Sequence, residues 1–498
     1  MKNRTCNPYL PSYEYVPDGE PHVFDGRLYI FGSHDRFNGE KFCMNDYVTW
    51  SCPVDDLSDW RYEGVIYKKT QDPENRDGKY AMWAPDVCVG PDGRYYLYYC
   101  LANYPKVAVA VADRPAGPYE FYGYVHAKDG RAWGDRKEGY FPFDPAILVD
   151  DDGSIHLYAG QGPLDIADAV ICMQRGTRDT VYHVELEEDM LTMKFEPDPL
   201  IPDVKRSKGT GFEGHEFFEA SSIRKFNGKY YFIYSSVLSH ELAYAVSDYP
   251  DRGFVCKGTL VSNGDVTDGY ANVRFVMQEP ATFRLKNYTA NTHGSIVCVN
   301  GEYYVFYHRH TNWHGYSRQG CAEKISLYPD GTFSRAFMTS SGVGGPWKAK
   351  GTFKAYTACL LQSRYGAMTI LNTKKDHIPH PGFTQEGPDR EDNPNQYIAN
   401  LTDGARCGFK WFDFGKTGSD TGDITKITVK IRGNVRGVVM VRNLEERGDV
   451  VAIIPVDHRD VREWECFSAD FVPQNGVKAL YFQYFGTGSM DFEEFTLS

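Results

Sequence analysis

Acidic side chains open several short strands of this sequence, and their positions suggest acid–base chemistry. Asp18, Asp144 and Glu219 each stand just before or at the start of an apolar stretch. Cleavage of a glycosidic bond requires one carboxylic acid that protonates the leaving oxygen and a second carboxylate that activates water or attacks carbon. A third carboxylate nearby raises the pKa of the acid and keeps it protonated near neutral pH. If the fold brings these residues together, they supply the groups needed to hydrolyse a glycoside.

The same residues belong to a pattern that recurs five times. Each copy has a leading residue, an apolar strand, a Gly-containing turn and a Tyr-rich strand, followed by a second strand-forming stretch. The leading residues, spaced by 68, 58, 75 and 74 positions, are Asp18, Asp86, Asp144, Glu219 and His293. Repeats of this length are typical of propeller blades, whose inner strands converge on a central channel. We therefore expect an all-β chain containing a five-bladed β-propeller; a β-sandwich with coincidental hairpins is the alternative.

Several motifs of the repeats resemble those of glycoside hydrolase family 43. They run from about Asn7 to Ala336 and are PDGEPHVF, WAPD, FDPA followed by DDDG, FFEASSIRK, HGSI and FYHRHTNWHGYSRQGCAE. The resemblance implies an inverting mechanism with Asp18 as general base, Asp144 as pKa modulator and orienting group, and Glu219 as general acid. The usual DPS triplet is replaced by Asp18-Gly19-Glu20, so Glu20 is a rival for the base.

Other polar and aromatic residues are candidates for substrate binding because they follow inner strands or lie in loops that can reach the same mouth. They are His34, Asp35, Trp83, Asp86, His308, His310 and Arg318. Trp83 could stack on the apolar face of a sugar, although a core position is the commoner role of Trp. Asp86 could instead fix a turn, and Arg318 could pair with Glu323 or a loop carboxylate. The segment 262–292 is expected to border the pocket.

The resemblance also implies a metal ion, although the chemistry itself needs no cofactor. In many members of the family a central histidine holds a calcium ion through its water shell, which would put His293 beside the metal. A core histidine satisfied by hydrogen bonds is the alternative.

The C-terminal third of the sequence has a different character. Residues 1–338 form the expected propeller, 339–355 a Gly/Ser/Thr-rich linker or crossing segment, and 356–498 a second all-β domain. This last part resembles carbohydrate-binding module family 6, a jelly-roll β-sandwich, through YIAN, GFKWFDF and DFEEFTL. The resemblance implies a second calcium site that includes Asp491. Trp411 and Tyr397 could form a sugar platform or belong to the core, and a purely structural sandwich is the other interpretation.

Composition limits the partners. The formal charge of −13 and the pI near 5.6 argue against nucleic acid or an anionic membrane, which would call for a basic face. The twelve cysteines form no CxxC pair and no zinc pattern, which favours free, mostly buried thiols. The N-terminus lacks the apolar core of a signal peptide, so a cytoplasmic protein is expected, or a secreted one if a signal was removed.

Together these observations predict an exo-acting glycosidase that releases pentose from arabinoxylan-type oligosaccharides. An α-L-arabinofuranosidase is the first choice, and a β-xylosidase or an enzyme with both activities is the alternative. A propeller that binds sugar without cleaving it is the alternative from another class. The sequence leaves the oligomeric state open.

Overall fold

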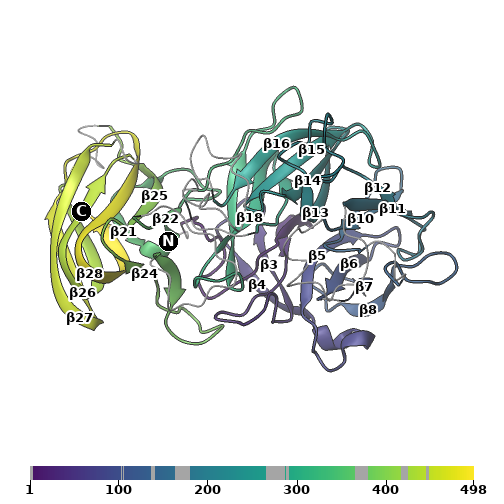
Figure 1. Cartoon of the computed structure of the whole chain (residues 1–498), viewed down its shortest axis with the longest axis horizontal. Helices are drawn as coiled ribbons and strands as arrows, with labels where there is room; N and C mark the ends of the chain where they lie inside the picture. Colours follow the sequence, from purple (N-terminus) through teal and green to yellow (C-terminus); the bar gives the residue numbers. More distant parts are fainter. Residues whose placement is uncertain are drawn as a thin grey trace.

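The computed structural model describes residues 4–102, 104, 106–135, 141–162, 180–264, 287, 291–364, 380–416, 424–444 and 448–498. Most of the segment expected to border the pocket, 262–292, lies outside these residues. The chain is almost entirely β-structure and forms two lobes, a propeller and a smaller sandwich, which lie side by side (Figure 1). The expected all-β class and the five-bladed propeller are confirmed.

The propeller lobe consists of five antiparallel sheets, each built from consecutive strands. The first two blades are β1 (Glu20–Phe24), β2 (Arg27–Phe31), β3 (Tyr47–Pro53) and β4 (Arg61–Tyr67), then β5 (Met82–Val89), β6 (Tyr95–Leu101), β7 (Val107–Ala112) and β8 (Glu120–Tyr124). The third and fourth are β9 (Ala146–Val149), β10 (Ile155–Gly160), β11 (Val181–Leu186) and β12 (Asp198–Pro199), then β13 (Phe217–Phe226), β14 (Lys229–Ser236), β15 (Glu241–Ser247) and β16 (Val255–Ser262). The fifth has β17 (Ile296–Val299), β18 (Glu302–His310) and β19 (Arg318–Ile325). Two 3-10 turns, η1 (Lys69–Gln71) and η2 (Pro73–Asn75), precede blade 2.

Local sequence explains why the inner hairpins form. In blades 1, 4 and 5 the two inner strands are joined by Asp25-Gly26, Asn227-Gly228 and Asn300-Gly301, and all six residues have positive φ. Two-residue turns with this conformation match the twist of antiparallel strands, and Asn-Gly or Asp-Gly adopts it most readily. The Tyr-rich second strand then packs between neighbouring blades, where Tyr98, Tyr158 and Tyr234 are fully buried.

The N-terminal segment closes the ring of blades. The inner strands contact one another around the channel, and a parallel bridge joins Gly19 to Gly294 between blades 1 and 5. The backbone nitrogen of Tyr9 donates to the carbonyl of Gly320 on β19 at 3.2 Å. The side chain of Asn7 mimics a strand partner on the same edge, because it accepts from the nitrogen of Ala322 and donates to its carbonyl. The first residues of the chain therefore complete its last blade.

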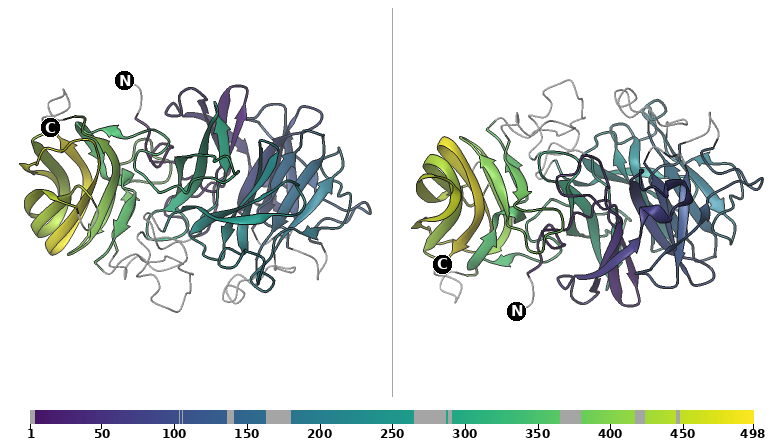
Figure 2. Two further views of the ribbon diagram at one scale, coloured as in Figure 1. Left: turned by 90° about the horizontal axis from the view of Figure 1, so that it is seen from above. Right: turned by 90° about the horizontal axis from the view of Figure 1, so that it is seen from below.

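The sandwich lobe begins earlier than expected. Strands β20 (Trp347–Lys348) and β21 (Gly351–Lys354) lie in the predicted linker 339–355, yet they pair with β25 (Arg406–Asp413) and β28 (Val477–Leu497). The remaining elements are η4 (Ala355–Thr357), β22 (Leu360–Gln362), β23 (Gly382–Gln385), β24 (Gln396–Leu401), β26 (Lys426–Arg442) and β27 (Val450–Asp470). The long strands β26–β28 curve over an aromatic core that includes Phe409, Phe482 and Phe495 (Figure 2).

One face of the sandwich docks on the propeller. Leu360, Ala479 and Tyr481 of the sandwich share a buried cluster with residues of blades 4 and 5, and Trp411 packs against that cluster. Trp411 therefore belongs to the docking face and not to a sugar platform. The docked position brings the two lobes close enough for side-chain contacts at the propeller mouth.

Two further sequence expectations concern the chain as a whole. Among the described residues every cysteine is a free thiol, and most are buried. No helix in the described ranges is long and apolar enough to cross a membrane.

Candidate active site

The three predicted catalytic carboxylates lie together at one mouth of the propeller, each at an irregular point of the backbone. Asp18 and Asp144 precede β1 and β9 with φ values of 56° and 47°. Glu219 lies in a bulged part of β13, and Ala220 after it has a φ of 68°. Such bulges and left-handed residues re-aim side chains and are frequent at active sites. The charges of all three carboxyl groups act on one another.

Asp18 is held by two side chains of blade 5. Nη1 of Arg318 donates to its Oδ1 at 2.8 Å. Nδ1 of His308 lies 3.4 Å from both Oδ1 and the backbone nitrogen of Asp18. Burial, with the nearby charge of Arg318, lowers the pKa of His308 well below its ordinary value, so this imidazole is neutral. Asp18 is thus an oriented carboxylate with one oxygen left for water or substrate.

The rival base, Glu20, occupies a different place. It is the first residue of β1, is about 1% exposed, and accepts from the Arg224 guanidinium and from Ser222. Its second oxygen faces His293 at 3.6 Å. Because both oxygens of Glu20 face buried partners, Asp18 is the better candidate for the base.

Glu219 has the environment of a general acid. Burial raises its pKa, the negative charge of Asp18 adds to this, and a hydrogen bond from Asn291 opposes it. Nδ2 of Asn291 lies 3.4 Å from Oε1, and Nε2 of Gln161 lies 3.5 Å from Oε2. The two amides orient the carboxyl group, and burial keeps its pKa above the ordinary value although the charges of His293 and Arg318 also lower it.

Asp144 lies between Glu219 and the centre of the channel. Its Oδ2 accepts from the backbone nitrogen of Ala220, next to Glu219, at 3.1 Å, and it lies 3.6 Å from Nδ1 of His293. Burial raises the pKa of Asp144 well above its usual value, Glu219 and Asp18 raise it further, and His293 opposes the shift. Asp144 thus fixes the backbone that carries Glu219, and the two carboxyl groups lie close enough to affect each other's ionisation.

His293 bridges Asp144 and Glu20 in the channel. Burial opposes its protonation, but Glu20, Asp144 and Asp18 outweigh this effect and raise its pKa to about 9. Its Nε2 and Nδ1 lie 3.6 Å from Glu20 and Asp144, so both ring nitrogens already face carboxylate oxygens. Glu20 in turn is already paired with Arg224. The donors present therefore do not fit the calcium ion expected beside His293.

Below this level the channel is filled by a paired cluster. Glu20, His22 and Asp86 have ligand atoms within 4.8 Å of one another, a spacing that could suit a metal. However, Nε2 of His22 is already bonded to Asp86 at 2.7 Å, and Arg224 lies between His22 and Glu20. Asp86 has no exposed surface and also accepts from the backbone nitrogens of Val87 and Ile147. The expected contact of Asp86 with sugar is wrong in this structure, because its carboxylate ties blade 2 to blade 3.

Four other predicted binding residues bond to the side chains and loops that form the site. His34 bonds to Glu14 and to the carbonyl of Asp46, and both oxygens of Asp35 bind Arg318. His308 and His310 both reach Asn291, through its carbonyl and its Oδ1. Each of the four is at most 3% exposed, so the expectation of direct contact with substrate is replaced by a supporting role.

Aromatic rings flank the carboxylates. Trp83 on β5 is partly exposed and packs edge to face on Phe143, next to Asp144, with ring centroids 5.0 Å apart. Phe42, also partly exposed, lies 4.9 Å below the guanidinium of Arg318. The two rings lie beside different carboxylates and can pack against a sugar. Phe42, Asn291 and Gln161 were not predicted, since no repeat or charge pattern distinguishes them in the sequence.

The second predicted metal ligand lies in the sandwich. Oδ2 of Asp491 accepts from Nε of Arg432 at 3.0 Å, and its Oδ1 accepts from the nitrogen of Asn400. Arg432 also stacks on Tyr397 and Trp464. A cation at Asp491 would have to displace Arg432, and the guanidinium covers the ring of Tyr397 that was a candidate sugar platform.

Comparisons with known proteins agree with this geometry. Residues 25–333 match the sequence profile of glycosyl hydrolases family 43. A xylosidase/arabinosidase from Thermoclostridium stercorarium is 48% identical over 500 residues, which is 100% of this chain and 99% of that protein. An arabinoxylan arabinofuranohydrolase from Paenibacillus polymyxa is 26% identical, over 94% of this chain and 70% of that protein.

Solved structures share the architecture. The RS223 β-xylosidase superposes with a TM-score of 0.50 at 25% identity, over 68% of this chain and 99% of its own. An arabinoxylan arabinofuranohydrolase from Bacillus subtilis superposes with a TM-score of 0.50 at 20% identity over 99% of this chain and 97% of its own. The latter shows that the same fold spans both lobes.

Proposed function

Because the chain belongs to glycosyl hydrolase family 43 and is a glycosidase, we propose that it removes terminal pentose units from arabinoxylan-derived oligosaccharides by an inverting mechanism. Both α-L-arabinofuranosides and β-D-xylosides are its substrates. In this mechanism Asp18 is the general base, Glu219 the general acid, and Asp144 the group that orients Glu219 and raises its pKa. Trp83 and Phe42 bind the sugar.

The contrast between Asp18 and Glu219 carries this proposal. Asp18 accepts from the buried guanidinium of Arg318, which orients one carboxylate oxygen and leaves the other to accept a proton from water. Glu219 is half-buried between amides, and this burial raises its pKa, which favours the protonated form that a leaving oxygen needs. Two carboxyl groups in such different surroundings, one beside a guanidinium and one beside neutral amides, suit hydrolysis of a glycosidic bond.

The names of the relatives support the choice of sugar. The protein from T. stercorarium, which is similar over the full length of both chains, is a xylosidase/arabinosidase, and the protein from P. polymyxa acts on arabinoxylan. A terminal arabinofuranose and a terminal xylopyranose present similar hydroxyl patterns to a shallow pocket. We therefore propose both activities in one site, with no metal ion in the chemical step.

Hydrolysis of p-nitrophenyl α-L-arabinofuranoside and β-D-xylopyranoside tests the proposal, with wild type beside Asp18→Asn. We expect the wild type to release nitrophenol from both and the variant to lose both activities in parallel, because one base serves one site. Proton NMR of the first sugar released reports the stereochemistry, and an anomer opposite to that of the substrate is expected. Retention of the anomer, or an active Asp18→Asn variant, would overturn the assignment of the base.

A further inference from the structure

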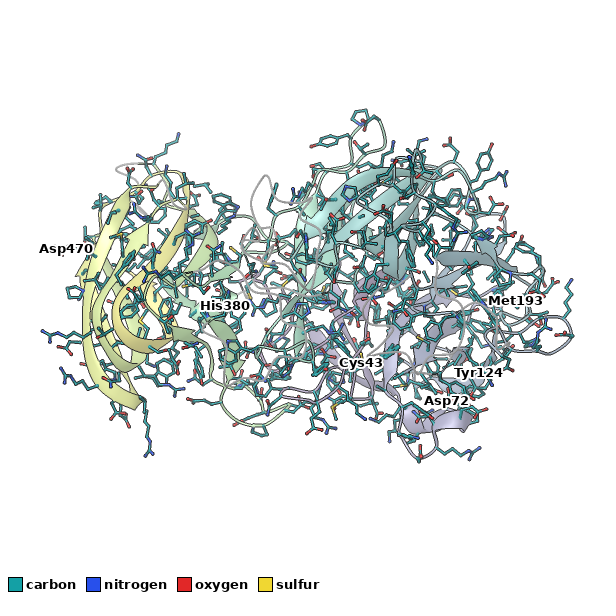
Figure 3. The ribbon with its side chains drawn as sticks, viewed as in Figure 1. Cys43, Asp72, Tyr124, Met193, His380 and Asp470 are labelled. Carbon is teal, nitrogen blue, oxygen red and sulfur yellow. The ribbon has the colours of Figure 1, made fainter. Side chains whose placement is uncertain are left out.

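The sandwich lobe touches the loops that build the propeller mouth. Strand β23 and the segment 386–395 lie against two of them, 34–46 and 311–317. The backbone nitrogen of Asn312 donates to the carbonyl of Phe383 at 2.7 Å, and Nε1 of Trp313 donates to the carbonyl of His380 at 2.8 Å. In Figure 3, His380 lies at the edge of the sandwich lobe nearest the propeller, and Cys43, in the loop 34–46, lies in the half of the propeller lobe that faces the sandwich.

Asp389, in the segment 386–395, makes the most specific of these contacts. Its Oδ1 accepts from the backbone nitrogen of Phe37 at 2.7 Å, and its Oδ2 accepts from Nδ2 of Asn45 at 3.1 Å. One carboxylate therefore holds both sides of the loop 34–46. Hydrogen bonds with an ionised acceptor are about twice as strong as neutral ones, so this contact fixes the loop firmly.

The loop in turn carries the group that orients Arg318. Nδ2 of Asn45 also donates to the carbonyl of Asp35 at 3.0 Å, and Oδ1 of Asp35 accepts from the nitrogen of Cys43. Asp35 binds Arg318 through Nε and Nη2, at 2.9 and 3.1 Å. The remaining nitrogen, Nη1, binds Asp18. A continuous path of hydrogen bonds thus joins Asp389 to the proposed base.

A second contact from the same segment reinforces the path. Nη1 of Arg390 lies 2.6 Å from Oε1 of Glu14 and 3.0 Å from Nε2 of His34, the residue before Asp35. Glu14 is fully buried and also accepts from Trp50 at 2.7 Å. Asp389 and Arg390 therefore both hold the start of the loop, at Phe37 and at His34.

We infer that Asp389 of the sandwich lobe is a positioning residue for the glycosidase reaction: it holds the loop 34–46 so that Asp35 and Arg318 aim Asp18. The inference rests on the proposed role of Asp18. The sandwich is thus a part of the catalytic apparatus, whatever sugar it binds elsewhere. Misplacement of a catalytic group by about 1 Å can cost up to 100-fold in rate, so a loosened loop has a measurable effect.

The test compares Asp389→Ala, Asn45→Ala and the double variant in the full-length chain. We expect each single variant to lower kcat roughly tenfold with little change in KM, because orientation of the base affects the chemical step more than sugar binding. The double variant should be no slower than the slower single one, since both changes break the same path. Asp389→Asn keeps the acceptor for Phe37 and should restore part of kcat.

Asp403→Ala is the matched control. Asp403 also accepts from one backbone nitrogen and one side chain, those of Gly486 and Arg364, but both partners belong to the sandwich. The Asp403→Ala variant should keep the kcat of the wild type. Thermal unfolding checks that all variants are folded. A folded Asp389→Ala variant with kcat within twofold of wild type, or single effects that multiply in the double variant, would overturn the inference. An active Asp18→Asn variant would instead overturn the proposed base, so the two failures are distinguishable.

Discussion

Arg318 and Asp18 form a buried ion pair between blades 5 and 1, with Nη1 of the guanidinium 2.8 Å from Oδ1 of the carboxylate. Three other contacts, from its backbone nitrogen, Nε and Nη2, fix Arg318 on Asp35. The bidentate contact with Asp35 therefore orients the planar guanidinium toward Asp18, and a lysine cannot reproduce this contact.

Arg318→Lys should for this reason be nearly as damaging as Arg318→Met. We expect kcat on the aryl pentosides to fall about 100-fold in both variants. Neither the single ammonium group of lysine nor the methionine side chain can bind Asp35 and Asp18 as the planar guanidinium does, so Asp18 is no longer oriented. Steady-state kinetics and circular dichroism of the purified variants check this. A lysine variant with nearly full activity would show that charge alone suffices.

Glu219→Gln should separate substrates by their leaving group. Activity on xylo-oligosaccharides should fall by two to four orders of magnitude, roughly the range of general acid catalysis, whereas aryl glycosides with activated leaving groups should lose less. Burial raises the pKa of Glu219, so the wild type keeps a protonated acid to higher pH than an ordinary Glu would, and the alkaline limb of kcat/KM should vanish in the variant. Glu213→Gln, on an exposed loop, is the control; equal losses on both substrate types contradict the role of acid.

Trp83→Ala should weaken sugar binding, while Trp83→Phe should retain most of it. A ring contact contributes on the order of 1 kcal/mol, so kcat/KM for xylo-oligosaccharides should fall up to about tenfold in the alanine variant. The comparison with phenylalanine separates loss of the ring from loss of indole. An unchanged KM in Trp83→Ala would exclude Trp83 from the sugar site.

His293 makes stability depend on pH in a defined window. Its folded pKa of about 9 lies above the ordinary value of 6.5, so its stabilising effect is complete below pH 6.5 and is lost as pH rises through about 9. The difference corresponds to about 3 kcal/mol. Denaturant unfolding between pH 6 and 10 should show this decline in the wild type and a flatter profile in His293→Gln. Parallel profiles would mean that His293 is neutral in the folded protein.

Because the guanidinium of Arg224 already pairs with Glu20, we expect that the protein needs no metal ion in the channel. EDTA should leave both the melting temperature and the activity of the wild type unchanged. Arg224→Met should lower the free energy of unfolding by about 3–5 kcal/mol, because it removes the guanidinium partner of the buried Glu20. Arg61→Met, which breaks an exposed pair with Glu63, should cost less than about 1 kcal/mol. Loss of stability in EDTA would point to a bound cation.

The sequence predicted those parts of the fold that occur in every repeat. Hairpins with Asp-Gly or Asn-Gly turns and strand-leading acids have a local signature, and they led to the five blades and to Asp18, Asp144 and Glu219. Strands β20 and β21 were missed because two to four residues carry no periodicity. Their pairing depends on β25 and β28, whose paired residues come 65 and 140 to 146 positions later.

The misplaced site residues share one cause. His34, Asp35 and Asp86 are polar and follow or lie in short strands, so they look available to a ligand. Their partners lie far away in the chain, as Arg318 does at a separation of 283 residues from Asp35. Such pairings turn a candidate ligand contact into a supporting one, and a single sequence does not reveal them.

The contact of Asn7 and Tyr9 with β19 has a consequence for how the protein is made. Their partners, Ala322 and Gly320, leave the ribosome more than 300 residues later. The ring of blades stays open during most of synthesis, and its two ends must find each other across a loop of that length. The first residues of the nascent chain are thus among the last to reach their final position.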